Sequence, residues 1–138
     1  MLPEDKYFQT LTEKELWQRY CGFLELPVDE FMNIQKHLLM EQIELVANSP
    51  LGKKIMDGKP KSVEEFRRIV PLTTYDDYEP YLSERREDAL GVKPLFWCHS
   101  AGRGGNFKWI PYTSEGFNVY TTLYLGFLIL AAANKKER

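Results

Sequence analysis

Residues 94–113 read PLFWCHSAGRGGNFKWIPYT and decide the local fold, because two bulky apolar runs flank a glycine-rich stretch. The runs at 95–98 and 107–112 are short and rich in aromatic residues, which predicts two strands, with Pro111 at the end or open edge of the second. Between them lies SAGRGGN, with glycine at 102, 104 and 105. Glycine lets backbone amides approach a ligand closely and surround an anion. The stretch therefore predicts a strand–loop–strand unit whose loop is the place to look for function.

A long apolar helix is expected after the second strand. Residues 117–133 carry no charged side chain, Thr113 or Ser114 can cap the helix, and Glu115 falls in its first turn. The run is about as long as the shortest membrane span, but polar residues interrupt its first turns: Asn118, Thr121 and Thr122. A helix that is apolar on all sides is what the centre of a larger soluble fold requires. We therefore expect a buried core helix and no membrane span.

The first two-thirds of the chain predicts helices with recognisable start and stop signals. Capping-box patterns begin at Thr12 and Ser62, and a helix after Pro27 is expected to be capped by Asp29 and to stop at 48–50. The cap within 72–77 predicts another helix, interrupted at Pro80 and ending near Gly91. The fold class expected is α+β: a mostly helical N-terminal part, the strand–loop–strand unit and the apolar C-terminal helix, within a single domain over residues 1–138.

Composition excludes several classes of protein. The 138 residues include 18 basic and 20 acidic side chains, so the net charge of −2 gives no polyanion-binding signature and nucleic acid is not an expected partner. The apolar fraction of 43% excludes wholesale disorder. Cys21 and Cys98 lie far apart, and with two histidines they make no zinc-site spacing, so no metal ligand is assigned. The N-terminus lacks a secretory signal, and we expect a cytoplasmic protein.

Three known motifs compete for the loop at 100–106. A Walker A loop places its Lys directly after a glycine at the start of a helix, whereas Lys108 follows Gly105 by three residues and leads into a strand. A Rossmann fingerprint needs a third glycine where Phe107 stands. A nucleophile elbow would use Ser100 for acyl transfer, but an elbow leads into a helix and takes its His from later in the chain, and no histidine follows His99. A hydrolase that uses Ser100 as nucleophile therefore ranks third, well behind the two interpretations that follow.

The segments around the loop resemble the N-terminal part of the auxin-responsive acyl-acid amido synthetases. The resemblance rests on SPLGKK at 49–54, SVEEF at 62–66, VPLTTYDDYEPY at 70–81 and KWIPYT at 108–113, and it covers roughly residues 29–133. The pattern VPLTTYDDY is fairly specific to this branch. These proteins belong to the adenylate-forming superfamily, together with acyl-CoA synthetases, phenylacetate-CoA ligases and luciferases. The resemblance implies a partial N-terminal domain of the adenylate-forming fold.

The resemblance also implies a nucleotide site. In that superfamily a loop reading approximately Ser-Ser-Gly-Thr-Ser/Thr-Gly, then a two-residue spacer and Lys, wraps the phosphates of ATP. Laid over this chain, the phosphate-binding residues are Ser100, Gly102, Arg103, Gly104, Gly105 and Lys108. The implied reaction converts a small carboxylic acid and ATP, with Mg²⁺, into an acyl-adenylate and pyrophosphate. No catalytic residue is assigned, because the attacking carboxylate is already ionised and the loop contributes electrostatic stabilisation.

The loop departs from the family pattern at three hydroxyl positions, which here are Ala101, Arg103 and Gly104. Two interpretations stay open. Either Arg103 replaces neutral donors with a charge-assisted contact to phosphate, or the loop has lost its nucleotide.

Length gives a further expectation. Family members are several times longer and place the nucleoside contacts, the acyl pocket and a mobile lid downstream of the segments found here. We expect a fragment or truncated relative of an acyl-adenylate-forming ligase, inactive on its own. The alternative is a non-enzymatic helical protein whose aromatic-rich helices and exposed C-terminal helix bind a partner or a second copy of the chain. The fragment should expose apolar surface where the missing sheet would pack, and the alternative should expose it on the C-terminal helix.

Overall fold

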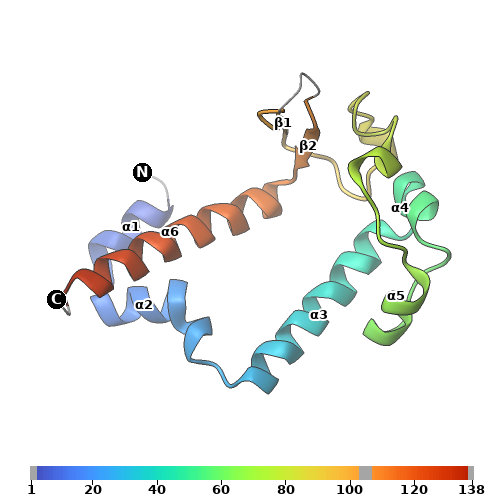
Figure 1. Ribbon diagram of the computed structural model, residues 1–138. Coiled ribbons are helices and arrows are strands. Elements are labelled where there is room, and N and C mark those ends of the chain that lie inside the picture. The colour runs from blue at the N-terminus through green and yellow to red at the C-terminus, as the bar shows by residue number, and fades with distance from the viewer. Residues whose placement is uncertain (1–2, 103–106, 137–138) are drawn as a thin grey trace. The chain divides into compact units, whose positions relative to one another are not determined.

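The computed structural model describes residues 3–102 and 107–136 (Figure 1). The α-helices, 3₁₀ helices (η) and strands follow in the order α1 (Pro3–Thr10), α2 (Glu13–Cys21), η1 (Gly22–Glu25), α3 (Val28–Val46), α4 (Pro50–Ile55), α5 (Val63–Ile69), η2 (Tyr75–Tyr78), η3 (Glu87–Ala89), β1 (Phe96–His99), β2 (Trp109–Tyr112) and α6 (Ser114–Lys136). This mostly helical chain with one antiparallel strand pair and a long apolar final helix confirms the predicted α+β class. The chain forms two compact units, one of Met1–Met32 with Glu115–Arg138 and one of Asn33–Ser114.

In the first unit, a capping box starts α2 as predicted. The Thr12 hydroxyl oxygen accepts from the Glu15 amide at 3.3 Å, and the Glu15 carboxylate accepts from the Thr12 amide at 2.8 Å and from its hydroxyl at 2.7 Å. These bonds from Thr12, the side-chain one first, stabilise the charged carboxylate and lower the pKa of Glu15. The α-helix ends at Cys21, and Gly22 begins a 3₁₀ turn.

The same unit is held together where α2 meets α6. Gly126 is buried, and a Cβ placed on it would lie 2.9 Å from the carbonyl oxygen of Tyr20. The buried Cys21 thiol donates to the Gly126 carbonyl at 3.4 Å, and burial raises the pKa of this thiol. Gly126 therefore lets α2 and α6 approach each other closely.

Helix α1, which the sequence did not predict, packs on the same unit. Its Phe8 stacks on Tyr20 of α2 with ring centroids 6.1 Å apart.

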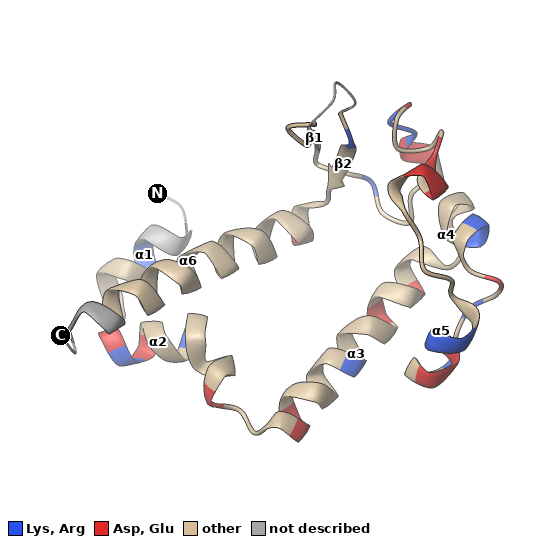
Figure 2. Ribbon diagram, in the orientation of Figure 1, with Lys and Arg blue, Asp and Glu red and all other residues tan. Residues whose placement is uncertain are grey.

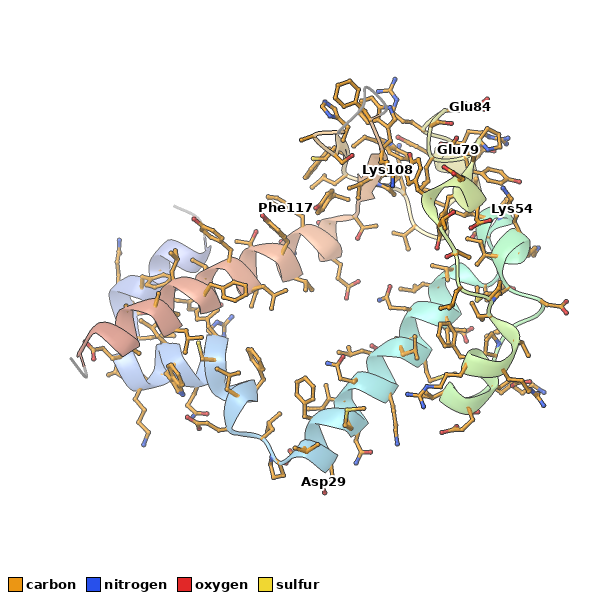
Figure 3. All side chains as sticks on the ribbon, in the orientation of Figure 1. Asp29, Lys54, Glu79, Glu84, Lys108 and Phe117 are labelled. Carbon is orange, nitrogen blue, oxygen red and sulfur yellow. The ribbon has the colours of Figure 1, made fainter. Side chains whose placement is uncertain are left out.

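In the second unit, α3 provides the core together with α4 and α5. Ile43, Ala47 and Met56 are buried, and partly buried side chains pack around them: Leu39, Met40, Ile55, Phe66 and Val70. The expected cap at Asp29 is two residues late, because α3 begins at Val28 and Asp29 lies in its first turn (Figure 3). The expected stop at 48–50 is also the start of α4, with Ser49 as N-cap and Pro50 at the first helical position. Proline fits there because that amide has no partner in a helix.

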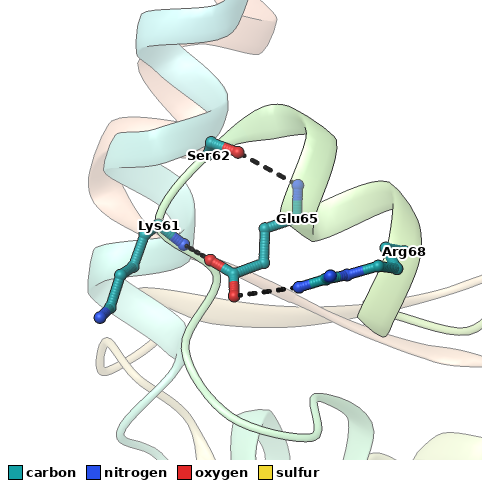
Figure 4. Close-up of polar contacts among 4 residues, drawn as sticks. All are labelled: Lys61, Ser62, Glu65 and Arg68. Atoms are coloured by element: carbon teal, nitrogen blue, oxygen red, sulfur yellow. Dashed lines mark hydrogen bonds and ion pairs between the residues drawn. The ribbon is translucent and has the colours of Figure 1, made fainter.

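A close-up of α5 shows a variant of the predicted capping box (Figure 4). The Ser62 hydroxyl oxygen accepts from the Glu65 amide at 3.1 Å, as expected. The Glu65 carboxylate, however, accepts from the amide of Lys61 at 2.7 Å instead of that of Ser62, and it lies 3.6 Å from the Arg68 guanidinium. The start of α5 is therefore held by two hydrogen bonds, as in a capping box. The bond to the Glu65 carboxylate comes from Lys61, one residue before the N-cap.

The helix predicted between the cap at 72–77 and Gly91 is wrong. The segment forms only the 3₁₀ turns η2 and η3, joined by irregular turns. Pro80 cannot donate an amide hydrogen bond, and Arg85 has a φ of 53°, in the left-handed region that breaks a right-handed helix. The predicted cap itself is present, because Thr74 and Asp77 form a capping box at the start of η2.

Candidate functional site

The predicted strand–loop–strand unit is present as an antiparallel hairpin of β1 and β2. The strands pair in the register Phe96↔Tyr112, Trp97↔Pro111, Cys98↔Ile110 and His99↔Trp109. The pairing continues beyond the strands, because the Ser100 amide donates to the Lys108 carbonyl at 3.0 Å and the Lys108 amide donates to the Ser100 hydroxyl oxygen at 3.2 Å. Ser100 and Lys108 therefore face each other where the loop leaves the hairpin.

The structure brings together the three predicted site residues that it describes. Ser100 is half-buried. Lys108, which is labelled in Figure 3, is exposed. Gly102 has a φ of 27°, in the left-handed region that favours glycine. Arg103, Gly104 and Gly105 lie outside the described residues. The hydroxyl of Ser100 accepts from the Lys108 amide through a lone pair, so its own proton can be donated to an anion.

The hairpin excludes the nucleophile elbow. An elbow requires a helix directly after the nucleophile, whereas Ser100 is followed by the loop and then by β2. The imidazole of His99 contacts the rings of Phe107 at 4.6 Å and Trp109 at 5.3 Å, and its Nδ1 lies 3.2 Å from the Ser100 carbonyl oxygen. His99 thus packs against aromatic rings and does not act on the Ser100 hydroxyl.

Two residues from upstream turns, Tyr75 and Arg85, contact β2. The Tyr75 hydroxyl accepts from the Trp109 amide at 2.8 Å and lies 3.3 Å from the Trp109 carbonyl oxygen, to which it donates. The Lys108 ammonium lies 5.5 Å from the centre of the Tyr75 ring, and the Arg85 guanidinium 4.6 Å from the centre of the Trp109 ring. Sequence analysis placed Tyr75 only within the helix expected after the cap at 72–77 and missed this contact. The one signal for it was the position of Tyr75 within VPLTTYDDY.

The described residues provide cations near the loop but no preformed metal site. Within residues 3–102 and 107–136, no three His, Cys, Asp or Glu side chains gather in a way that could hold a metal ion. Mg²⁺ prefers oxygen ligands and commonly binds through substrate phosphates and one or two carboxylates.

A separate apolar cavity of about 650 Å³ opens in the second unit. Its walls come from the end of α3, from α4 and α5, and from the turns after them: Val46, Leu51, Met56, Phe66, Val70 and Leu90 are among the lining residues. Arg67, Thr73 and Tyr78 supply polar groups. Ser100, Gly102 and Lys108 are not part of the lining, so the cavity is distinct from the hairpin site.

Helix α6 follows the hairpin directly and exposes most of its apolar surface. Only 6% of its most apolar 18-residue window is buried, and by length and composition the segment Ser114–Ala133 is sufficient to cross a membrane. Core helices of soluble proteins can be equally long and apolar, so length and composition do not distinguish a membrane span from a core helix. Figure 2 shows no charged residue in α6 between its first turn and the grey residues at its C-terminal end. The prediction of exposed apolar surface on this helix is confirmed, whereas burial of the helix within this chain is not found.

A domain of helices carrying a strand–glycine loop–strand unit is the class of structure that these elements define. Comparison with protein families identifies it further: the model of the GH3 family N-terminal domain matches residues 22–137. The chain therefore belongs to the GH3 family, the auxin-responsive acyl-acid amido synthetases, as the sequence motifs predicted. No curated protein and no solved structure gives a significant match.

Proposed function

We propose that the hairpin binds the phosphates of ATP in an acyl-adenylate-forming reaction of the amido synthetase type. The observation that carries this proposal is the pairing of Ser100 with Lys108 at the mouth of a glycine-rich loop, in a chain of this family. The left-handed backbone at Gly102 supports it, because such a turn can direct successive amides toward an anion. Arg103, Gly104 and Gly105 complete the proposed loop.

The proposed chemistry needs charge stabilisation and no general base. A carboxylate oxygen attacks the α-phosphorus of ATP, a new bond to that phosphorus forms, and the bond to the departing pyrophosphate breaks. Negative charge grows on pyrophosphate as it leaves, and the ammonium of Lys108 with the donated proton of Ser100 would stabilise that charge. Mg²⁺ would neutralise part of the same charge when bound with the nucleotide.

Titration of the 138-residue chain with ATP by isothermal calorimetry tests the site. We expect Lys108→Gln to weaken binding by at least about tenfold, since hydrogen bonds to charged groups are strong. The matched control is Lys93→Gln, which removes an exposed lysine of the same unit that lies 3.7 Å from Glu87. A chain that shows no heat of binding, or that binds equally well without Lys108, would contradict the proposal.

We further propose that this chain alone releases no pyrophosphate. The family resemblance places the nucleoside contacts and the acyl pocket in segments downstream of those present in this sequence. A coupled pyrophosphate assay with a panel of aliphatic and aromatic carboxylic acids should therefore stay at background even when ATP binds. Pyrophosphate formed at a rate that depends on the acid would overturn this statement.

A second candidate function rests on α6. Large apolar side chains of this helix are exposed, including Leu123 at 50% and Phe127 at 68%. No charged side chain lies within residues 117–133, so two copies can bring these helices together without burying a charge. We therefore also propose self-association of the chain through α6, independent of ATP.

A further inference from the structure

We infer that Tyr75 is the positioning residue of the phosphate site, acting on Lys108 through two separate contacts. Its hydroxyl fixes the backbone next to Lys108, and its ring holds the ammonium group of Lys108. Tyr75 itself would touch no part of the nucleotide. The effect on ATP rests on the proposed function, whereas the effect on the position of Lys108 does not.

The backbone contact follows from strand geometry. Ser100 and Lys108 form a hydrogen-bonded pair, and in an antiparallel hairpin the next residue turns its N–H and C=O away from the partner strand. Trp109 therefore presents both groups on the outer edge of β2. The Tyr75 hydroxyl accepts from this N–H at 2.8 Å and donates to this C=O at 3.3 Å. A single side chain thus occupies both backbone groups beside Lys108.

The second contact restricts the lysine side chain. A lysine on the surface loses considerable rotamer entropy when a ligand fixes it. The Lys108 ammonium lies 5.5 Å from the centre of the Tyr75 ring, within the range of a cation–π interaction. Among the described residues no carboxylate lies within 4.0 Å of this ammonium. The ring therefore orients the cation without neutralising the charge that a phosphate requires.

Tyr75 is held in place by its own turn. It is the first residue of η2, where Thr74 and Asp77 form the capping box. Tyr78, at the other end of the same turn, has its hydroxyl 2.7 Å from that of Thr73, and among the described residues it makes no hydrogen bond to β2. The turn thus offers two tyrosines of similar exposure, of which one contacts the hairpin, and this pair makes a matched control.

The experiment compares the wild-type chain with Tyr75→Phe, Tyr75→Leu and the control Tyr78→Phe. Nuclear magnetic resonance of the nucleotide-free protein measures amide exchange at Trp109 and the ring-current shift of the Lys108 side-chain methylenes. Calorimetry measures the Kd for ATP. Thermal melts establish that each variant is folded, and Tyr75→Phe carries the test should Tyr75→Leu fail to fold.

We expect Tyr75→Phe to accelerate amide exchange at Trp109 several-fold, because the amide loses its acceptor. Tyr75→Leu should also abolish the ring-current shift of Lys108. Loss of the cation–π contact alone should weaken ATP binding by about twofold to fivefold, and loss of the backbone contacts should weaken it further. Tyr78→Phe should match the wild-type chain in all three measurements.

Failure of ATP binding and failure of the positioning role of Tyr75 give different results in these measurements. A wild-type chain that does not bind ATP would refute the proposed function, while the resonance data would still decide whether Tyr75 positions Lys108. Unchanged Lys108 shifts and unchanged Trp109 exchange in Tyr75→Leu would overturn the positioning role. Equal affinity of the wild-type chain and Tyr75→Leu for ATP would overturn it as well.

Discussion

Asp77 shows how one carboxylate fixes a short turn that supports the site. Its Oδ2 accepts from the Thr74 amide at 2.6 Å and from the Thr74 hydroxyl at 3.1 Å. These bonds, the backbone one first, favour the ionised form and lower the pKa of Asp77 below its ordinary value of 3.8. A carboxylate whose pKa is lower in the folded than in the unfolded state stabilises the fold above the unfolded value. That stabilisation is lost as the pH falls through the folded value.

We predict that Asp77→Asn lowers the midpoint of thermal unfolding at neutral pH, because the charge-assisted bonds to Thr74 are lost. The deficit relative to the wild-type chain should shrink as the pH falls below the unfolded pKa of about 4 and through the lower folded pKa. Circular dichroism melts at several pH values measure this. Asp76→Asn is the control, as it removes a neighbouring exposed carboxylate of the same turn. A deficit that is equal at every pH would show that the charge is not the cause.

Contacts between residues that are close in the sequence were predictable, and contacts between residues far apart in the sequence were not. The cap at Thr12 and the pairing of Ser100 with Lys108 follow from short motifs, because both partners lie within a few residues of each other or across one hairpin. Tyr75 contacts Trp109 at a separation of 34 residues. No local propensity specifies such a contact, and Tyr75 was therefore not among the candidate site residues predicted from the sequence.

At the scale of elements, Gly52 allows α4 to approach the end of α3. The Ser49 hydroxyl accepts from the Gly52 amide at 2.9 Å and donates to the Val46 carbonyl at 2.7 Å. A Cβ placed on Gly52 would lie 1.9 Å from the same carbonyl oxygen. The glycine is therefore required by contact between two helices, although its position in a helix is intrinsically unfavourable by about 1 kcal/mol relative to alanine.

We predict that Gly52→Ala destabilises the chain by about 2 kcal/mol or more, since overpacking against backbone outweighs the gain in helix propensity. Urea denaturation followed by circular dichroism gives the change in the free energy of unfolding. Lys53→Ala, an exposed position in the same helix, should be close to neutral. A neutral or stabilising effect of Gly52→Ala would mean that the two helices do not approach as closely as described.

Elements with start signals were predicted better than elements that proline interrupts. The capping patterns at Thr12 and Ser62 correctly predicted α2 and α5. Pro50 was interpreted as a stop although it also starts α4, and the region around Pro80 was predicted as helix although it forms turns. The tyrosines of that region have helical spacing, yet Tyr75 and Tyr78 serve tertiary and turn contacts instead. Helical spacing alone does not distinguish tyrosines on the face of a helix from tyrosines that make turn or tertiary contacts.

At the scale of the whole molecule, the exposure of α6 is the property that composition did not reveal. An apolar fraction of 43% is ordinary for a soluble protein. Much of that apolar area is nevertheless exposed on one helix: Phe117, Val119, Tyr120, Leu123, Tyr124, Phe127 and Leu128 are each more than 40% exposed. Contiguous apolar surface of this kind is what the proposed self-association through α6 would bury. The sequence predicted the helix α6. Whether its apolar side chains are buried depends on which segments or chains pack against it, and the spacing of apolar residues does not specify these.

If a second copy of the chain covers this surface, association should depend on concentration and on α6. We predict that the double substitution Leu123→Asn with Phe127→Asn shifts the chain toward monomer in sedimentation velocity runs over a range of concentrations. The two side chains are one helical turn apart and exposed, so the monomer should keep its stability. Leu72→Asn is the control, because Leu72 is fully exposed but lies in the other unit.

The same experiment separates the two proposed functions. ATP binding through Lys108 requires no association, and self-association through α6 requires no nucleotide. Addition of ATP should therefore leave the sedimentation profile unchanged, and the α6 double variant should bind ATP with the wild-type Kd. A wild-type chain that stays monomeric at every concentration would refute self-association. An equal shift toward monomer by Leu72→Asn would show instead that association is not specific to α6.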